Sequence, residues 1–368
     1  MNPLHTKSLR AFDTTLLSRA LVIKLRHHGD VLLASPVLSA LKRVAPQCEV
    51  DALVYADTAA MMEGHPALSR LHLIDRNWKH AGPFRQMAAE SNLLRRLLAR
   101  RYDLVVHLTD HPRGAWLTRL IKPAWSVAPE SAPRWWWRNS FRALYRHPIG
   151  RSRHTIEINL DALRRLGIQP ADDDKALRLV AGAAAEARID ELFIRCGLTA
   201  GSYIHIHPGS RWLFKCWPAA SIAQLADALA AQGFRIVLTA APGAAEGKMI
   251  ETVRKSMNAA VIDLAGQLNL KELAALTARA RLFVGVDSAP MHIATAMGTP
   301  VVALFGPTDD IAWAPWSVVA RVVTSGQHPC RPCGLDGCGG SKVSECLTQL
   351  PVARVLAACN ELLAGGWR

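Results

Sequence analysis

Hydrophobic residues in the first half of the chain alternate between short continuous runs and runs with helical spacing. The continuous runs are rich in Val, Ile and Leu, which is typical of strands buried on both faces of a parallel sheet. We predict such strands at 20–25, 49–54, 71–74 and 103–108. Helical spacing predicts helices at 31–44, 84–101 and 113–121. The alternation indicates a parallel sheet with helices on both faces.

The second half repeats this alternation. We predict strands at 203–207, 234–239, 260–263, 282–286 and 301–305, and helices at 218–232, 246–257, 270–279 and 288–297. Segment 123–153 shows neither pattern, whereas 154–167 has helical spacing and leads into a polar linker at 169–175. We therefore expect an α/β fold of two doubly wound domains, 1–170 and 171–350, which face a central cleft. A final helix within 351–368 is expected to pack back on the first domain.

Composition narrows the class of protein. The 368 residues, half of them hydrophobic, are enough for two domains with cores of their own. No run of about 18 uncharged apolar residues occurs, and the first 20 residues lack the continuous apolar stretch of a secretory signal. We expect a soluble or peripheral cytoplasmic protein.

Positive charge is concentrated in the first half. The chain has 44 Lys and Arg against 30 Asp and Glu, and residues 1–170 hold 26 of the basic and 13 of the acidic residues. This asymmetry favours nucleic acid, anionic lipid or a phosphorylated substrate as partner. No helix-turn-helix, RNP or zinc-finger spacing accompanies the charge, which argues against a nucleic-acid-binding protein without removing that alternative.

The first predicted strand leads directly into a charged turn and a helix. In LRHHGDVLL, Gly29 would allow a tight turn and Asp30 would lie at the N-terminus of the helix. Ligands of open parallel sheets bind at this kind of position. The turn is not GxGxxG, so the dinucleotide fingerprint of an NAD-dependent oxidoreductase is missing.

Three strand ends in the second half carry loops that suit a phosphate. HPGSRWLFKCWP, 207–218, offers Ser210, Arg211 and Lys215, although an ordinary surface loop explains it about equally well. In VDSAPMHIA, Asp287 and Ser288 would cap a helix whose N–H groups attract a diphosphate.

Further residues at these loops are candidates for binding the same ligand. His292 would face the same pocket or be a satisfied core histidine. Gly306 and Thr308 in FGPTD offer further N–H groups, and Glu246 after a Gly/Pro turn suits ribose hydroxyls.

With these motifs in view, the chain resembles the ADP-heptose:lipopolysaccharide heptosyltransferases, the inverting enzymes of glycosyltransferase family 9. KLRHHGDVLLASP resembles the family's first strand, turn and helix, and KCWP, VDSAPMHIA and LFGPTD resemble its donor-site motifs. LRHHGD, SRWLFKCW and CRPCGLDGCGG make the heptosyltransferase III subgroup the most similar. The resemblance implies the two-domain GT-B fold, with two Rossmann-like domains.

The resemblance also implies a reaction. L-glycero-D-manno-heptose would pass from ADP-heptose to an inner-core heptose of lipopolysaccharide, with inversion and without a metal or other cofactor. Another nucleotide sugar in the same fold is the main alternative. The partners would be a phosphorylated heptose/Kdo lipid A core and the cytoplasmic face of the inner membrane, to which the enzyme would be peripheral, and not nucleic acid.

Residue roles follow from the resemblance and from the motifs. Asp30 would be the catalytic base, and Lys215 would stabilise the departing diphosphate. The donor-binding residues would be Ser210, Arg211, Glu246, Asp287, Ser288, Ala289, His292, Gly306 and Thr308. The acceptor-binding residues would be Lys24, Arg26, His27, His28, Gly29 and Arg113, with Arg134 and Arg138 as further basic candidates. His27 stands where many family members have serine, so contacts to the acceptor differ there.

Two features have no settled role. RWWWR, 134–138, fits either an interfacial membrane anchor or core tryptophans. Four thiols, Cys330, Cys333, Cys338 and Cys346, could bind zinc, but their spacing is not the paired CxxC pattern. Reduced thiols or a redox-sensitive loop are the alternatives.

Overall fold

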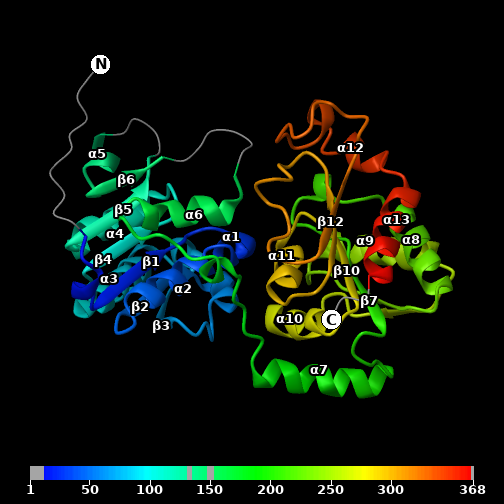
Figure 1. Cartoon of the computed structure of the whole chain (residues 1–368), viewed down its shortest axis with the longest axis horizontal. Coiled ribbons are helices and arrows are strands. Elements are labelled where there is room, and N and C mark those ends of the chain that lie inside the picture. The colour runs from blue at the N-terminus through cyan, green and yellow to red at the C-terminus, as the bar shows by residue number, and fades with distance from the viewer. Residues whose placement is uncertain (1–11, 131–134, 147–152, 366–368) are drawn as a thin grey trace. The chain divides into compact units, whose positions relative to one another are not determined.

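The computed structural model describes residues 12–130, 135–146 and 153–365. The chain divides into two compact units (Figure 1). Unit 1 comprises Met1–Ile149 and Ile156–Lys175, and unit 2 comprises Gly150–Thr155 and Ala176–Arg368. From the sequence we expected the domain boundary between residues 170 and 171. By contacts, the chain passes from unit 1 to unit 2 after Lys175, and 150–155 is grouped with unit 2.

Unit 1 contains a six-stranded parallel sheet with the order β3-β2-β1-β4-β5-β6. Its strands are β1 (Arg19–Ile23), β2 (Glu49–Tyr55), β3 (Leu68–Ile74), β4 (Leu104–His107), β5 (Trp125–Pro129) and β6 (Ala143–Tyr145). Its helices are α1 (His28–Leu32), α2 (Ser35–Val44), α3 (Pro83–Arg100), α4 (Pro112–Ile121), α5 (Trp135–Arg138) and α6 (Thr155–Arg164). Four 3-10 helices complete it: η1 (Thr14–Leu16), η2 (Ala56–Met61), η3 (Arg76–His80) and η4 (Asp173–Lys175).

The central strand β1 has partners on both sides, Ala20 pairing with Val50 of β2 and with Leu104 of β4. Its apolar residues are fully buried, as the continuous run in the sequence indicated. The strand order reverses at β1/β4, so a crevice is expected beyond the carboxyl ends of these strands. Lys24 to Asp30 follow β1 at this point.

Unit 2 repeats the architecture, with the order β12-β11-β10-β7-β8-β9. Its strands are β7 (Tyr203–His207), β8 (Arg235–Leu238), β9 (Val261–Asp263), β10 (Leu282–Val286), β11 (Val301–Phe305) and β12 (Ala320–Thr324). Its helices are α7 (Ala183–Cys196), α8 (Ala219–Ala231), α9 (Ala244–Ser256), α10 (Leu270–Ala278), α11 (Ala289–Ala296), α12 (Glu345–Thr348) and α13 (Val352–Ala364), with 3-10 helices η5 (Leu213–Lys215) and η6 (Cys338–Gly340). Counted from its own first strand, each sheet has the order 3-2-1-4-5-6 of a Rossmann fold.

The sequence missed some elements. Segment 123–153, expected to be irregular, contains β5, α5 and β6. Strand β5 (WSVAP) is interrupted by Ser126 and ends in Pro129, and β6 has only three residues, so neither gives a continuous apolar run. The helix expected at 31–44 is two helices, because the chain bends at Leu33 and Ala34 between α1 and α2. Gly29 lies inside α1 without a positive φ, so it does not form the tight turn that we expected. Helix α7 and strand β12 were not anticipated.

The final helix belongs to unit 2. Helix α13 packs on α8 and β12 of this unit. Val355, Cys359 and Leu362 of this helix are buried in the same core cluster as Ile204 and Val284. The apolar face of α13 completes one side of the second sheet.

Candidate functional site

Lys24 is the residue that follows β1, and it is buried. Its ammonium group donates hydrogen bonds to the Leu108 carbonyl at 3.2 Å and to Asn159 Oδ1 of α6 at 3.0 Å. Burial lowers the pKa of Lys24 to about 8, opposed by the negative charge of Asp30. Lys24 therefore ties β1 to α6, and it is not the exposed phosphate contact that the sequence suggested.

Asp30 lies in the first turn of α1 and is half-buried. Among the described residues, its side chain has no hydrogen-bond or ion-pair partner, and the cap position of the helix belongs to His27. The Asp30 carboxylate is therefore not occupied by capping. It is a partly solvated acceptor, next to a buried cation, that an incoming hydroxyl can reach.

Ion pairs connect the neighbouring strand ends of unit 1. Arg26 donates to Asp110 Oδ1 after β4 at 2.7 Å. Arg76, after β3, donates to both carboxylate oxygens of Asp57 at 3.1 and 3.2 Å and to the Arg26 carbonyl at 3.0 Å. The guanidinium of Arg76 also stacks 3.6 Å above the ring of Tyr55. These pairs fix a polar rim around the end of β1.

Two histidines join this rim. His28 Nε2 lies 2.8 Å from the Asp57 carbonyl oxygen, and His111 Nε2 lies 3.0 Å from the Tyr55 hydroxyl. Burial lowers the pKa of His111, with Arg113 adding to the effect. Sequence reasoning missed Tyr55, Asp57, Arg76, Asp110 and His111. Their position directly after predicted strands was the signal that would have found them.

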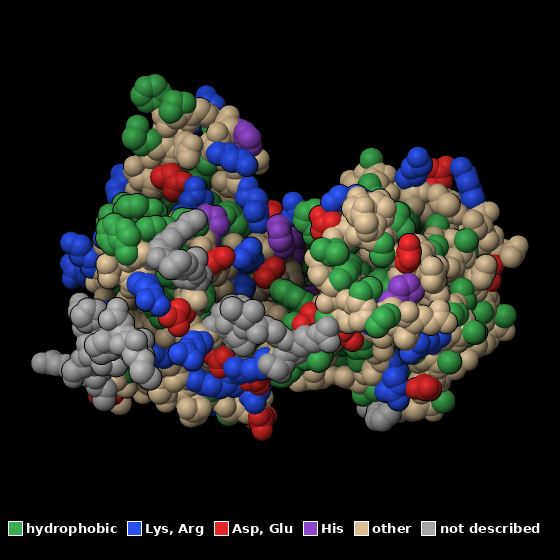
Figure 2. Space-filling model, turned by 90° about the horizontal axis from the view of Figure 1, so that it is seen from above, with side chains coloured by type: hydrophobic (Ala, Val, Ile, Leu, Met, Phe, Trp, Pro, Cys, Tyr) green, Lys and Arg blue, Asp and Glu red, His purple; other side chains and the backbone are tan. Residues whose placement is uncertain are grey.

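The remaining basic candidates of unit 1 are paired or lie elsewhere. Arg113 pairs with Glu90, and Arg138 pairs with Glu130 at 2.6 Å. Arg134 lies outside the described residues. Figure 2 shows Lys and Arg side chains spread over the surface of unit 1, on the left in that view, together with Asp, Glu and hydrophobic side chains.

The tryptophans of 134–138 are divided between the core and the surface. Trp137 is buried, and its indole N–H donates to the Pro129 carbonyl at 3.0 Å. Trp135 is 72% exposed. Trp136 stacks on Trp116 of α4 with ring centroids 6.3 Å apart. One ring is thus a core residue, and the others form part of the surface.

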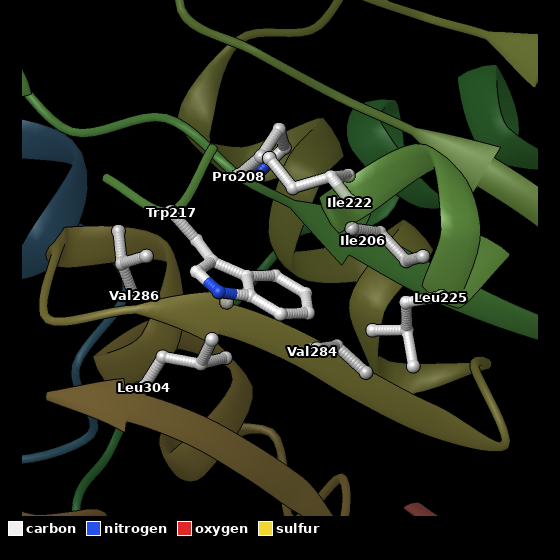
Figure 3. Close-up of a pocket in the computed structure, with 9 residues that line it drawn as sticks. Ile206, Pro208, Trp217, Ile222, Leu225, Val284, Val286 and Leu304 are labelled. Atoms are coloured by element: carbon white, nitrogen blue, oxygen red, sulfur yellow. The ribbon is translucent and has the colours of Figure 1, made fainter. Parts of the chain in front are cut away.

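In unit 2, Trp217 anchors the loop that follows β7. Its indole lines a small apolar pocket together with residues of β7, α8, β10 and β11 (Figure 3). The indole N–H donates to the Leu350 carbonyl at 3.0 Å. The loop can therefore move little at its end, and Lys215, two residues earlier, is held over the sheet edge.

Lys215 Nζ donates to Asp287 Oδ2 at 2.7 Å, and both side chains are mostly buried. This pairing corrects the expectation that Asp287 caps α11. Ser288 occupies the cap position, but its hydroxyl donates to the Val286 carbonyl at 3.2 Å instead of accepting from the helix. Pro290 has no N–H, and the Met291 N–H donates to the Ser288 carbonyl at 3.1 Å. Among the described residues of this first turn, the Ala289 N–H is therefore the one left for a ligand.

The other donor candidates lie around the same strand ends. Ser210 is buried, whereas Arg211 is exposed and lies 5.2 Å from the ring of Trp212. His292 is buried one turn into α11, 6.3 Å from the ring of Trp313.

Glu246 is buried behind the β7 loop. Its Oε2 accepts from the Ala241 N–H at 2.9 Å and lies 3.7 Å from His207 Nε2. A Cβ on Gly209 would lie 2.2 Å from the same oxygen. Gly209 is therefore required for the loop to pass Glu246, and a ribose contact by Glu246 stays a prediction.

The turn after β11 is packed equally closely. A Cβ on Gly306 would lie 2.5 Å from Leu347 Cδ1. The Thr308 hydroxyl is buried and has no hydrogen-bond partner. The ends of β7, β10 and β11, which are adjacent in the sheet, thus bring together Lys215, Asp287 and Thr308 with the first turn of α11.

Comparison with known proteins identifies the family to which this chain belongs. The family model described as glycosyltransferase family 9 (heptosyltransferase) matches residues 90–343. Lipopolysaccharide heptosyltransferase 3 of Escherichia coli K12 is 33% identical over 344 residues, covering 92% of this chain and 96% of the relative.

This chain belongs to glycosyltransferase family 9.

The chain is therefore a glycosyltransferase, as its motifs indicated. A family 9 glycosyl transferase from Veillonella parvula matches with a TM-score of 0.81 at 23% identity, covering 96% of this chain and 99% of that one. E. coli heptosyltransferase WaaC with ADP matches with a TM-score of 0.71 at 21% identity, covering 94% and 99%. These likenesses confirm the GT-B fold with two Rossmann-like units.

The cysteines of this glycosyltransferase do not form the predicted metal site. Among the described residues, no group of three or more His, Cys, Asp or Glu side chains is arranged to hold a metal ion. Cys330 and Cys333 are exposed and Cys346 is buried, and all eight cysteines are free thiols. The zinc interpretation has no geometric support.

Proposed function

We propose that this glycosyltransferase transfers L-glycero-D-manno-heptose from ADP-heptose to an inner-core heptose of lipopolysaccharide. The observation that carries the proposal is the identity of 33% to lipopolysaccharide heptosyltransferase 3 across nearly the whole of both chains. A different nucleotide sugar in the same fold is the alternative, because the fold alone does not fix the donor.

The donor would bind at the strand ends of unit 2. As the glycosidic bond breaks, the ADP diphosphate gains negative charge, which Lys215 and the Ala289 N–H at the start of α11 would stabilise. Asp287 keeps the Lys215 ammonium in position, so no side-chain reorganisation is needed when the charge develops. Charge stabilisation by these protein groups is consistent with a reaction that needs no metal.

Asp30 would be the general base. A carboxylate without a protein partner accepts the proton of the acceptor hydroxyl, whose oxygen then attacks the anomeric carbon as ADP leaves from the opposite face. A single displacement of this kind inverts the anomeric configuration.

The acceptor's phosphate groups would meet the rim of Arg26, Arg76 and Arg113. Each of these guanidinium groups is paired with a carboxylate, so a phosphate would compete for donors that are already oriented. The proposed acceptor carries lipid A, so the enzyme would meet it at a membrane surface.

We propose that unit 1 contacts an anionic membrane, at its cytoplasmic face, through the exposed rings of α4 and α5. Trp116 and Leu120 are 58% and 50% exposed on α4, and Trp135 is more exposed still. Arg119 lies beside the Trp116 ring at 5.7 Å, which combines a cation with an aromatic face as interfacial segments do. No described helix is long and apolar enough to cross a membrane.

Calorimetry with ADP-heptose, UDP-GlcNAc and NAD tests the proposed donor. We expect ADP-heptose to bind and the other two to bind at least about tenfold more weakly, because the donor site is proposed to be selective for an ADP-sugar. Preferential binding of UDP-GlcNAc would establish the alternative transferase, and preferential NAD binding would contradict the proposal.

Sedimentation with vesicles tests the membrane contact. We expect the chain to bind phosphatidylglycerol vesicles, and the double variant W116A/W135A to bind them several-fold more weakly. The control variant Ile194→Ala removes an apolar side chain of α7 in unit 2 that is even more exposed, at 84%, and it should not change vesicle binding. Equal binding by all three proteins would refute the contact.

A further inference from the structure

The loop that carries the four clustered cysteines folds back on the turn after β11. The Gly334 N–H donates to the Pro307 carbonyl at 2.9 Å, and Arg331 Nε donates to the Gly306 carbonyl at 2.7 Å. Leu347, at the end of this segment, packs against Gly306. The loop between β12 and α12 therefore holds one of the three donor-site turns from outside.

Arg331 is unusual within this loop. Its side chain is only 8% exposed, and its Nη2 group is buried without a hydrogen bond. The carboxylate of Asp310 lies 3.6 Å from Nη2, which is an ion pair but is too long for a hydrogen bond. Leaving a charged donor buried without a hydrogen bond costs free energy. A group of this kind calls for a ligand.

A second unsatisfied group lies on the same turn. The Thr308 hydroxyl is also buried without a partner, two residues after the carbonyl that holds Arg331. An arginine fork and a hydroxyl are donors that suit phosphate oxygens. Lys215, the cation identified from the sequence motif, already donates a hydrogen bond to Asp287. The N–H groups of Arg331 Nη2, in contrast, make no hydrogen bond among the described residues.

We propose that Arg331 is a donor-site residue of this transferase, and that its guanidinium, with the Thr308 hydroxyl, binds the diphosphate of the nucleotide sugar. The proposal rests on the proposed function, because it requires the donor to be a nucleoside diphosphate sugar. The diphosphate takes the place of Asp310 at Nη2, while the Nε bond to Gly306 keeps the side chain in position. The cysteine-bearing loop thus supplies a binding residue in addition to its packing role.

Affinities for ADP and adenosine, compared by calorimetry, test the proposal because adenosine lacks the diphosphate. Arg331→Met should weaken ADP binding about tenfold or more and leave adenosine binding unchanged. Arg331→Lys, which retains the charge without the fork, should fall between the two. Lys342→Met removes a cation from the same loop, one that is 67% exposed and paired with Asp336, and should behave as the unmodified protein.

The outcomes are distinct. If Arg331→Met weakens ADP and adenosine equally, or leaves both unchanged, Arg331 is only a structural support for the turn and the proposal is overturned. If Arg331→Met does not fold, ADP and adenosine affinities are compared in Arg331→Lys and Thr308→Val instead. A preference for ADP over adenosine that is unchanged in both of these variants overturns the proposal. Failure of the unmodified protein to bind ADP would instead contradict the proposed function.

Discussion

The ion pair of Lys215 and Asp287 gives a diphosphate a cation whose position is fixed beforehand. We predict that Lys215→Ala lowers the rate of transfer by about 10²–10³, as losing one preorganised electrostatic contact does. ADP affinity, measured by calorimetry, should fall as well. An ADP affinity equal to that of the unmodified protein would remove Lys215 from the donor site.

Asp30 is predicted to act on the acceptor and not on the donor. Asp30→Asn keeps the size of the side chain and removes its basicity, so kcat should fall by about 10²–10⁴ while ADP-heptose binding stays near normal. Steady-state kinetics and calorimetry on the same preparation check this. Loss of donor binding would show that Asp30 has a structural or donor-binding role.

For single residues, the sequence predicted which side chains are chemically important better than it predicted their contacts. Lys215, Asp287 and Lys24 were recognised as chemically important from their motifs, but the partners of Lys215 and Lys24 lie 72 and 135 residues away. Spacing within a motif cannot show such long-range pairing. Arg331 was missed because only its burial distinguishes it from the many other arginines.

Close packing between elements explains two glycines of the donor edge, and Gly209 gives a test. Gly209→Ala would place a methyl group against the Glu246 carboxylate, so we expect a loss of stability of about 1–3 kcal/mol and weaker ADP binding. Gly247→Ala is the matched control in α9, because no atom lies within 4 Å of its Cβ, and it should gain about 0.5–1 kcal/mol. Urea unfolding of both variants measures this; equal stabilities would show that the β7 loop is not tightly packed.

Buried histidines at the ends of β4 and β7 make stability depend on pH. Burial lowers the pKa of His107 to about 3 and that of His207 to about 4, against 6.5 when unfolded. The unfolded chain therefore binds more protons below pH 6.5, and stability should fall as pH falls from about 6.5 towards 4.

The His207→Gln variant isolates one of these protons. The slope of unfolding free energy against pH, between pH 6 and 4.5, should be shallower than in the unmodified protein by at most about 1.4 kcal/mol per pH unit. Identical slopes would mean that folding does not lower the pKa of His207.

The elements themselves were largely predictable. Strands β7, β10 and β11 have the predicted bounds, because a strand buried on both faces needs a continuous apolar run. The short strands β5 and β6, only five and three residues long, carry no such run and were missed. The apolar face of α13 was recognised, but such a face does not specify which core it covers.

For the whole molecule, the charge asymmetry and the doubled Rossmann order agree with a transferase that uses anionic substrates. Since protein cations are proposed to stabilise the diphosphate, transfer should continue at an unchanged rate after treatment with EDTA. Assays with and without added Mg²⁺ measure this. An activity that EDTA abolishes and Mg²⁺ restores would require a metal in the mechanism.

Mass spectrometry of a heptose-truncated lipopolysaccharide core, incubated with the chain and ADP-heptose, tests the central claim most directly. The account predicts that the acceptor gains the mass of one heptose, and that Asp30→Asn gives no such product. No gain with ADP-heptose, together with sugar transfer from another nucleotide donor, would contradict it.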